Sequence, residues 1–377
     1  MATRKKAAVA EAVAVAVAGT PRKSRSPRKA AAVVANTPPP IVESKAEQPK
    51  LATKRRRAPK SAPGLVQGSL PTPGVDQALE RKLAKQPPRA LASPIRVFQM
   101  YVEPWQRELL DASFYPLDVS RVAPKELGLT VWTQLQTNDA TQGALLWGAV
   151  SWRFAEQTGM AGADWVRLIE QQPGADVYFS CADTAQEAVF HNPWLQTQVQ
   201  LPRLQVLAQA FFEAAGLPVA LLGSITPSSL YCTAPMVVGT PQFWAAYLPW
   251  LRKVLTTADK RMPAALRDEL HAPLPVGSAE SAASYVQLMV QMLLPVFLRS
   301  QGQDFKALRL ALPERERELN VHQKLLREMK DVAHRTQSAW LAACWVNYRN
   351  LYLGQTQSKP WVQKHLRSIT PSEIKFA

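Results

Sequence analysis

The chain has 377 residues, with 45 Lys and Arg against 29 Asp and Glu, which gives a formal charge of +16 at pH 7 and a pI of about 9.9. Residues 1–90 hold 19 of the basic and 5 of the acidic residues, so this segment carries +14 and the remainder is nearly neutral. This division argues against a basic nucleic-acid-binding surface on the folded part. The three cysteines form no CxxC pair, which argues against a disulfide framework or a zinc site.

Residues 1–90 are predicted to be a disordered basic tail. The segment contains twelve prolines and no Trp, Phe or Tyr, so too little apolar surface could be buried to offset the entropy of ordering. A basic run precedes the apolar residues 7–19 as in a secretory signal, but Glu11 interrupts them and further basic clusters follow. Such a tail could contact a polyanion, either nucleic acid or an anionic membrane surface, or serve as a solvated tether. With no disulfide framework and no spanning segment, we expect a cytoplasmic location.

Residues 91–377 are predicted to form one α/β domain, since apolar alternation and helical periodicity follow one another along this part of the chain. The first expected elements are a strand at 95–102, a helix starting at Pro104, a turn or loop at 114–118, a strand within 143–154, a helix at 163–171 and a strand at 176–181. The strand, helix, strand order of the last three predicts a parallel crossover.

The second half of the domain is predicted to be mainly helical. The expected elements are a helix at 201–215 closed by Gly216, a short strand at 236–239, a Trp-rich helix at 241–255 and a helical C-terminal part at about 279–353. Residues 285–298 are too few to span a membrane and are predicted to form a core helix. The predicted fold class is therefore α/β, a mixed sheet with flanking helices.

No self-sufficient catalytic motif is present. The sequence lacks GxSxG, GxxxxGK[ST], HExxH and a GxGxxG after the first strand, which argues against hydrolase, P-loop and Rossmann cofactor sites. It also lacks an Asp-x-Asp pair, with which two carboxylates could share a divalent ion and a diphosphate; Asp176 and Asp183 are too widely spaced. The sequence therefore identifies no metal ligand, and it leaves open whether a divalent cation is a cofactor.

Aromatic residues beside polar ones mark several predicted junctions between strands and loops. The clusters include Trp152 with Arg153, Tyr178, Asn192 with Trp194, and Trp244. Exposed rings next to polar groups suit stacking on sugars or nucleobases. The alternative, which is the commoner one for any single aromatic residue, is that these rings fill the core.

The order of these clusters resembles a known pattern. The boxes are Trp147-Gly-Ala-Val-Ser-Trp-Arg-Phe, Pro173-Gly-Ala-Asp-Val-Tyr-Phe, Asn192-Pro-Trp-Leu-Gln and Val238-Gly-Thr-Pro-Gln-Phe-Trp. Together they resemble a bacterial region found with or within glycosyltransferases of surface-polysaccharide synthesis, over roughly residues 95–350. The chain departs from that pattern at Val119, where Asn would follow Asp118, at Arg153, where Lys is usual, and at Thr233, where Asn would follow Cys232.

The resemblance implies a GT-A-like fold and transfer of a sugar from a nucleotide-sugar donor to a glycan acceptor. Under it, Asp118 would contact the base or ribose of the donor, and Asp176 would help to organise the diphosphate. The implied substrate-binding residues are Trp152, Arg153, Tyr178, Asn192, Trp194 and Trp244. Two alternatives remain: a non-enzymatic protein whose tail binds nucleic acid or another partner, and a catalytically inactive relative of the transferases.

Overall fold

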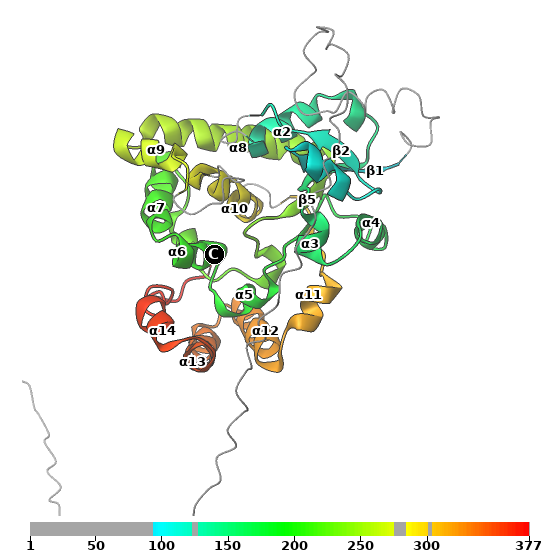
Figure 1. The fold of residues 1–377 in the computed structure, drawn as a ribbon. Coiled ribbons are helices and arrows are strands. Elements are labelled where there is room, and N and C mark those ends of the chain that lie inside the picture. Colours follow the sequence, from blue (N-terminus) through cyan, green and yellow to red (C-terminus); the bar gives the residue numbers. More distant parts are fainter. Residues whose placement is uncertain (1–92, 123–126, 275–283, 301–303, 377) are drawn as a thin grey trace, which may run out of the picture. The chain divides into compact units, whose positions relative to one another are not determined.

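A computed structural model of the chain describes residues 93–122, 127–274, 284–300 and 304–376, all of which belong to one compact unit. The predicted tail, residues 1–90, lies outside the described residues. In the described part of the chain, six strands form one mixed sheet with helices around it (Figure 1). The strands are β1 (Ile95–Tyr101), β2 (Tyr115–Asp118), β3 (Leu146–Ser151), β4 (Val177–Ser180), β5 (Met236–Gly239) and β6 (Ala307–Arg309).

The sheet has the order β2-β1-β3-β5-β4-β6, and β5 is the antiparallel strand among these six. The strands predicted within 143–154 and at 176–181 are β3 and β4. They run parallel, as the crossover prediction requires, but they are not neighbours because β5 lies between them. The helices α3 (Phe154–Thr158) and α4 (Gly162–Glu170) connect them.

A glycine allows β3 and β5 to approach one another. Gly148 pairs with Val238, and a Cβ atom placed on Gly148 would overlap the carbonyl oxygen of Val237. Glycine in a strand often marks such a close approach of two backbones. The antiparallel insertion of β5 beside β3 therefore depends on the absence of a side chain at this position.

Helices cover both faces of the sheet. Side chains alternate along the strands, so Phe98, Trp147 and Phe179 enter one hydrophobic cluster, while Val97 and Tyr178 enter another. The first cluster is completed by α2 (Leu127–Gln136), α7 (Arg203–Ala215), α8 (Pro241–Arg261) and α10 (Tyr285–Ser300). The second is completed mainly by α3 and α4.

Local signals set the ends of the long helices. The Thr240 hydroxyl accepts a hydrogen bond from Phe243 N (3.1 Å) at the start of α8, and Gly216 ends α7 with a φ of 72°. Both ends were predicted, but α8 continues beyond residue 255 to Arg261. The other short elements between residues 139 and 271 are α5 (Thr184–Val189), α6 (Pro193–Gln200), α9 (Ala264–His271) and the 3-10 helices η3 (Asp139–Thr141), η4 (Val219–Leu222) and η5 (Ser228–Leu230).

Two parts of the chain differ from the predictions. Residues 114–118, predicted as a turn or loop, contain the edge strand β2, where Pro116 is tolerated because only one side of the strand is paired. The three-residue strand β6 was not predicted at all. It is too short to carry an alternating pattern, and only its pairing with β4 defines it.

The C-terminal part is helical, as predicted, and packs as a separate cluster. It comprises α11 (Pro313–Glu318), α12 (Val321–Thr336), α13 (Ala339–Thr356) and α14 (Lys359–His365). Asn320 and Ser338 cap the starts of α12 and α13. Leu326 of α12 and Trp345 of α13 share this cluster with Val189 of α5. Figure 1 shows α5, α12 and α13 in the same part of the molecule. No helix among the described residues is long and apolar enough to cross a membrane.

Candidate functional site

The strand order contains a topological switch point between β1 and β3. The chain leaves β1 to form β2 on one side and then forms β3 on the other side of β1. In open α/β sheets, ligands bind beyond the carboxyl ends of the strands at such a point. A ligand site is therefore expected at the carboxyl ends of the parallel strands β1, β2 and β3, here called the carboxyl edge.

Asp118 lies at this edge. It ends β2 and pairs with Tyr101 of β1, while the preceding residue of β1, Met100, pairs with Ser151 of β3. Since neighbouring strands are about 4.8 Å apart, the backbones of Asp118 and Ser151 lie roughly 10 Å from each other. The half-buried Asp118 carboxylate accepts a hydrogen bond from Ser120 N (2.9 Å).

A buried glutamine holds the loops of this edge in place. The Gln99 amide nitrogen donates to the carbonyl oxygens of Ser151 (3.3 Å) and Trp152 (3.1 Å), and its oxygen accepts from Asp111 N (2.7 Å). Asp111 in turn accepts a hydrogen bond from Gly162 N (2.7 Å). The segments after β1 and after β3 are thus fixed to each other by a side chain that is 1% exposed.

Two tryptophans from these loops pack against each other. Trp105 lies in the 3-10 helix η1 (Pro104–Leu109), and its ring packs edge-to-face on Trp152 with 5.2 Å between the centroids. Trp105 is 47% exposed, and Trp152 is half-buried. The Arg153 guanidinium lies 5.9 Å from the Trp152 ring and pairs with Glu156, whose pKa this contact lowers. The edge therefore presents aromatic faces, a cation and a carboxylate together.

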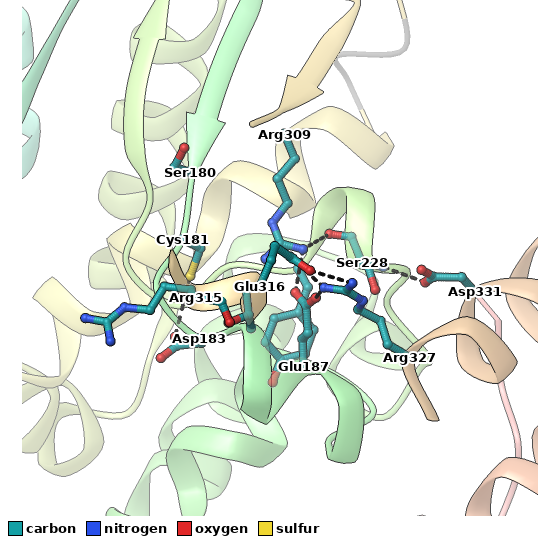
Figure 2. Close-up of polar contacts among 12 residues, drawn as sticks. Ser180, Cys181, Asp183, Glu187, Ser228, Arg309, Arg315, Glu316, Arg327 and Asp331 are labelled. Atoms are coloured by element: carbon teal, nitrogen blue, oxygen red, sulfur yellow. Dashed lines mark hydrogen bonds and ion pairs between the residues drawn. The ribbon is translucent and has the colours of Figure 1, made fainter. Parts of the chain in front are cut away.

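The carboxyl ends of β4 and β6 carry a second polar group, shown in Figure 2. The Asp183 carboxylate accepts hydrogen bonds from the Thr233 hydroxyl and, at 3.5 Å, from the Cys181 thiol. Burial raises the pKa of the Cys181 thiol, and the charge of Asp183 acts in the same direction. Cys181 is therefore held as a thiol, which is not the nucleophilic form.

Glu187 on α5 is the centre of a buried ion cluster. Its side chain is inaccessible to solvent and pairs with Arg309 of β6 and with Arg327 of α12 (3.2 Å), as Figure 2 shows. Arg327 also forms two 2.7 Å hydrogen bonds with Glu316 of α11. Burial raises the pKa of Glu187, although Arg309, Lys330 and Arg327 oppose that shift. The cluster joins α5, α11, α12 and the sheet.

Helix α11 lies across this second half of the edge. The Arg315 guanidinium donates to the carbonyl oxygens of Glu156 (2.8 Å) and Gln157 (3.1 Å) in the short helix α3. The Arg315 carbonyl accepts from the Thr184 hydroxyl of α5 (3.4 Å). The ends of β4 and β6 are thus occupied by the protein's own groups, whereas the edge at β1, β2 and β3 carries the exposed Trp105 and the half-buried Trp152.

Four of the residues predicted to bind substrate are buried and have partners inside the protein. The Tyr178 hydroxyl donates to Gln172 O (2.7 Å), and Trp244 Nε1 donates to Trp147 O (2.8 Å). Asn192 caps α6 and donates to two carbonyl oxygens, and Trp194 packs edge-to-face on Phe212. Their contacts are those of core residues.

The structure separates the two predicted catalytic aspartates. Asp118 is the last residue of β2, at the carboxyl edge, whereas Asp176 precedes β4 and lies at the opposite end of the strands. There the Asp176 carboxylate accepts a hydrogen bond from Lys306 N (2.8 Å), and its carbonyl accepts from Thr240 N (2.8 Å). Asp118, Trp152 and Arg153 therefore share one edge, and Asp176 does not join them.

Sequence reasoning did not single out Gln99 or Trp105. A polar residue inside an apolar strand was the available signal for Gln99, and a tryptophan just beyond the end of a strand was the signal for Trp105. In the described part of the chain, no group of three or more His, Cys, Asp or Glu side chains is placed to hold a metal ion.

The chain was compared with known protein families, curated proteins and solved structures. No family model, no curated protein and no solved structure matches the chain. The resemblance of its sequence boxes to a glycosyltransferase-associated region therefore stays a prediction.

Proposed function

We propose that the protein is a glycosyltransferase-type enzyme with a GT-A-like sheet, which moves a sugar from a nucleotide-sugar donor to a glycan acceptor. The observation that carries this proposal is the pair of the exposed Trp105 and the half-buried Trp152 at the switch point of the sheet, where Gln99 holds the backbone of Trp152. Planar rings that are held rigidly beside polar groups suit the flat apolar faces of sugars and bases.

The polar groups of the same edge fit the other parts of such a donor. Asp118 can accept hydrogen bonds from ribose hydroxyls or a base, because its carboxylate is only half-buried. The exposed Arg153 guanidinium can offset the charge of a diphosphate. Asp176 has no role in this proposal, because it lies at the other edge of the sheet.

Ligand-dependent thermal unfolding of the full chain tests the proposal. We would measure the unfolding midpoint with a panel of nucleotide sugars, with and without manganese. A donor at 100 times its dissociation constant should stabilise the fold by about 2.7 kcal/mol. We expect a selective shift with one nucleotide sugar, and its loss in Asp118→Asn and in Trp152→Ala.

A matched control uses Asp268→Asn on α9, because this exposed carboxylate lies away from the carboxyl edge. The shift should persist in this variant. A midpoint that no nucleotide sugar changes would overturn the proposal. If the full chain then bound DNA with a strong dependence on salt, the alternative of a binding protein acting through its basic residues 1–90 would be favoured.

A further inference from the structure

The pair formed by α12 and α13 exposes an apolar outer face. Each helix buries one side in the C-terminal cluster, with Leu326 on α12 and Trp345 on α13 fully buried. On the opposite sides, Val321 is 72% exposed on α12, and Trp340 and Leu351 are 77% and 65% exposed on α13. Large apolar side chains that gather at a surface commonly mark a protein interface.

The exposed side of α13 has the spacing of a helix that packs against another helix. Trp340, Cys344, Asn347 and Leu351 follow one another at intervals of four, three and four residues and form one stripe, here called the outer seam. This alternation is the repeat by which helices interdigitate along a common axis. The outer seam is therefore shaped for a partner helix.

Charge narrows the choice of partner. Helix α13 contains no acidic residue, and its single basic residue, Arg349, is fully buried. The outer seam therefore offers nothing to attract a polyanion or an acidic or basic peptide, and two copies of it would not repel each other. A partner that is uncharged and apolar where it meets α13 therefore matches the outer seam, and the exposed charges of Lys324 and Glu328 lie on the neighbouring helix α12.

We propose that this partner is the outer seam of a second copy of the chain, related by a two-fold axis. If two α13 helices cross antiparallel between Cys344 and Asn347, Trp340 of each copy meets Leu351 of the other, and Cys344 meets Asn347. The seam thus matches itself from end to end, as an isologous contact must.

Helix α12 widens this contact. The Asn320 amide donates to the Tyr352 hydroxyl (3.0 Å), so the start of α12 lies beside the later part of α13. Val321 and Leu325 therefore flank the end of the seam that receives the partner's tryptophan. With one large aromatic and three aliphatic side chains per copy, the buried area is on the order of 1,000 Å² in total, which is the range of weak, reversible dimers.

Sedimentation equilibrium of the full chain tests the dimer. We expect the mass to rise from 41.7 kDa towards twice that value over the micromolar range. Trp340→Glu and Leu351→Glu should each raise the dimer dissociation constant by at least about 30-fold, the effect of an anchor residue. Leu145→Glu, which changes a 67% exposed leucine elsewhere, should leave it unchanged.

Cross-linking tests the register. In Asn347→Cys, the new thiol should face Cys344 of the other copy and give a covalent dimer on oxidation that reductant reverses. Adding Cys344→Ser should remove most of it, while Cys181 and Cys232 are buried and cannot substitute.

Three outcomes would overturn the proposal: a monomer at every concentration, a dimer that survives both glutamate substitutions, and a dimer without this cross-link. Dissociation of the dimer by added salt would also overturn it, because an apolar contact is not screened.

Discussion

Replacing Glu187 with glutamine removes one negative charge from the buried ion cluster without changing the size of the side chain. Arg309 would keep its charge with only 11% of its side chain exposed, and the fully buried Lys330 would lose the carboxylate that favours its charged form. Burial lowers the pKa of Lys330 to about 8, because the interior disfavours the charged ammonium group. Removing the carboxylate therefore leaves the Arg309 cation in the interior without its anion and makes the charged form of Lys330 still less favourable.

The expected cost is large because the cluster connects several elements. Breaking a buried pair by removing one partner destabilises proteins by about 3–5 kcal/mol, since the remaining charge is uncompensated. That is a large part of a typical unfolding free energy of 5–15 kcal/mol. Arg327 still pairs with Glu316 (2.7 Å), so we expect about 3 kcal/mol for Glu187→Gln.

Urea unfolding followed by tryptophan fluorescence measures this cost. Trp345 Nε1 donates to the carbonyl oxygen of Ala188 (3.2 Å), next to the substituted residue, and is one of the eleven tryptophans whose fluorescence reports unfolding. The matched control is Glu314→Gln, whose exposed pair with Arg317 should contribute at most about 1 kcal/mol. Equal losses in the two variants, or a loss below 1 kcal/mol for Glu187→Gln, would refute the reasoning.

Two further predictions concern buried positions. Burial and the charge of Arg349 lower the pKa of His191 well below 6.5, so below pH 6.5 the unfolded chain binds a proton that the folded chain does not. Stability should fall by up to about 1.4 kcal/mol per pH unit there, and unfolding measured at pH 7 and pH 5 should show less of this loss in His191→Asn. Gly148→Ala should cost at least about 3 kcal/mol in urea unfolding or prevent folding, because its Cβ would overlap Val237 O. Gly354→Ala on α13, where nothing lies within 4 Å of the added atom, should be neutral or stabilising, and equal effects at the two positions would contradict the close approach of β3 and β5.

The sequence located part of the candidate site. Trp152 and Arg153 were identified because they follow an apolar strand, and the structure places them at the carboxyl edge together with Asp118. The same reasoning selected Trp244 and Asn192, which are fully buried. The sequence next to a strand does not distinguish an aromatic or polar residue that is exposed from one that is buried, since exposure depends on which helices cover that end of the sheet.

By itself, the sequence determined what short stretches of chain can decide. Alternating and β-branched residues predicted β1, a short apolar run predicted β4, the glycine after α7 predicted its end, and Pro241 predicted the start of α8. Composition also placed +14 of the net charge of +16 in residues 1–90. These features depend on residues close together in the chain.

Only the tertiary structure decided the order of the strands and the grouping of distant side chains. The insertion of β5 between β3 and β4 depends on the contact of Gly148 with a strand about 90 residues later. The resemblance implied that Asp118 and Asp176 contact one donor, yet the direction of the strands puts them at opposite ends of the sheet. Local patterns do not encode pairing between remote segments, because such pairing is selected by the packing of the whole sheet.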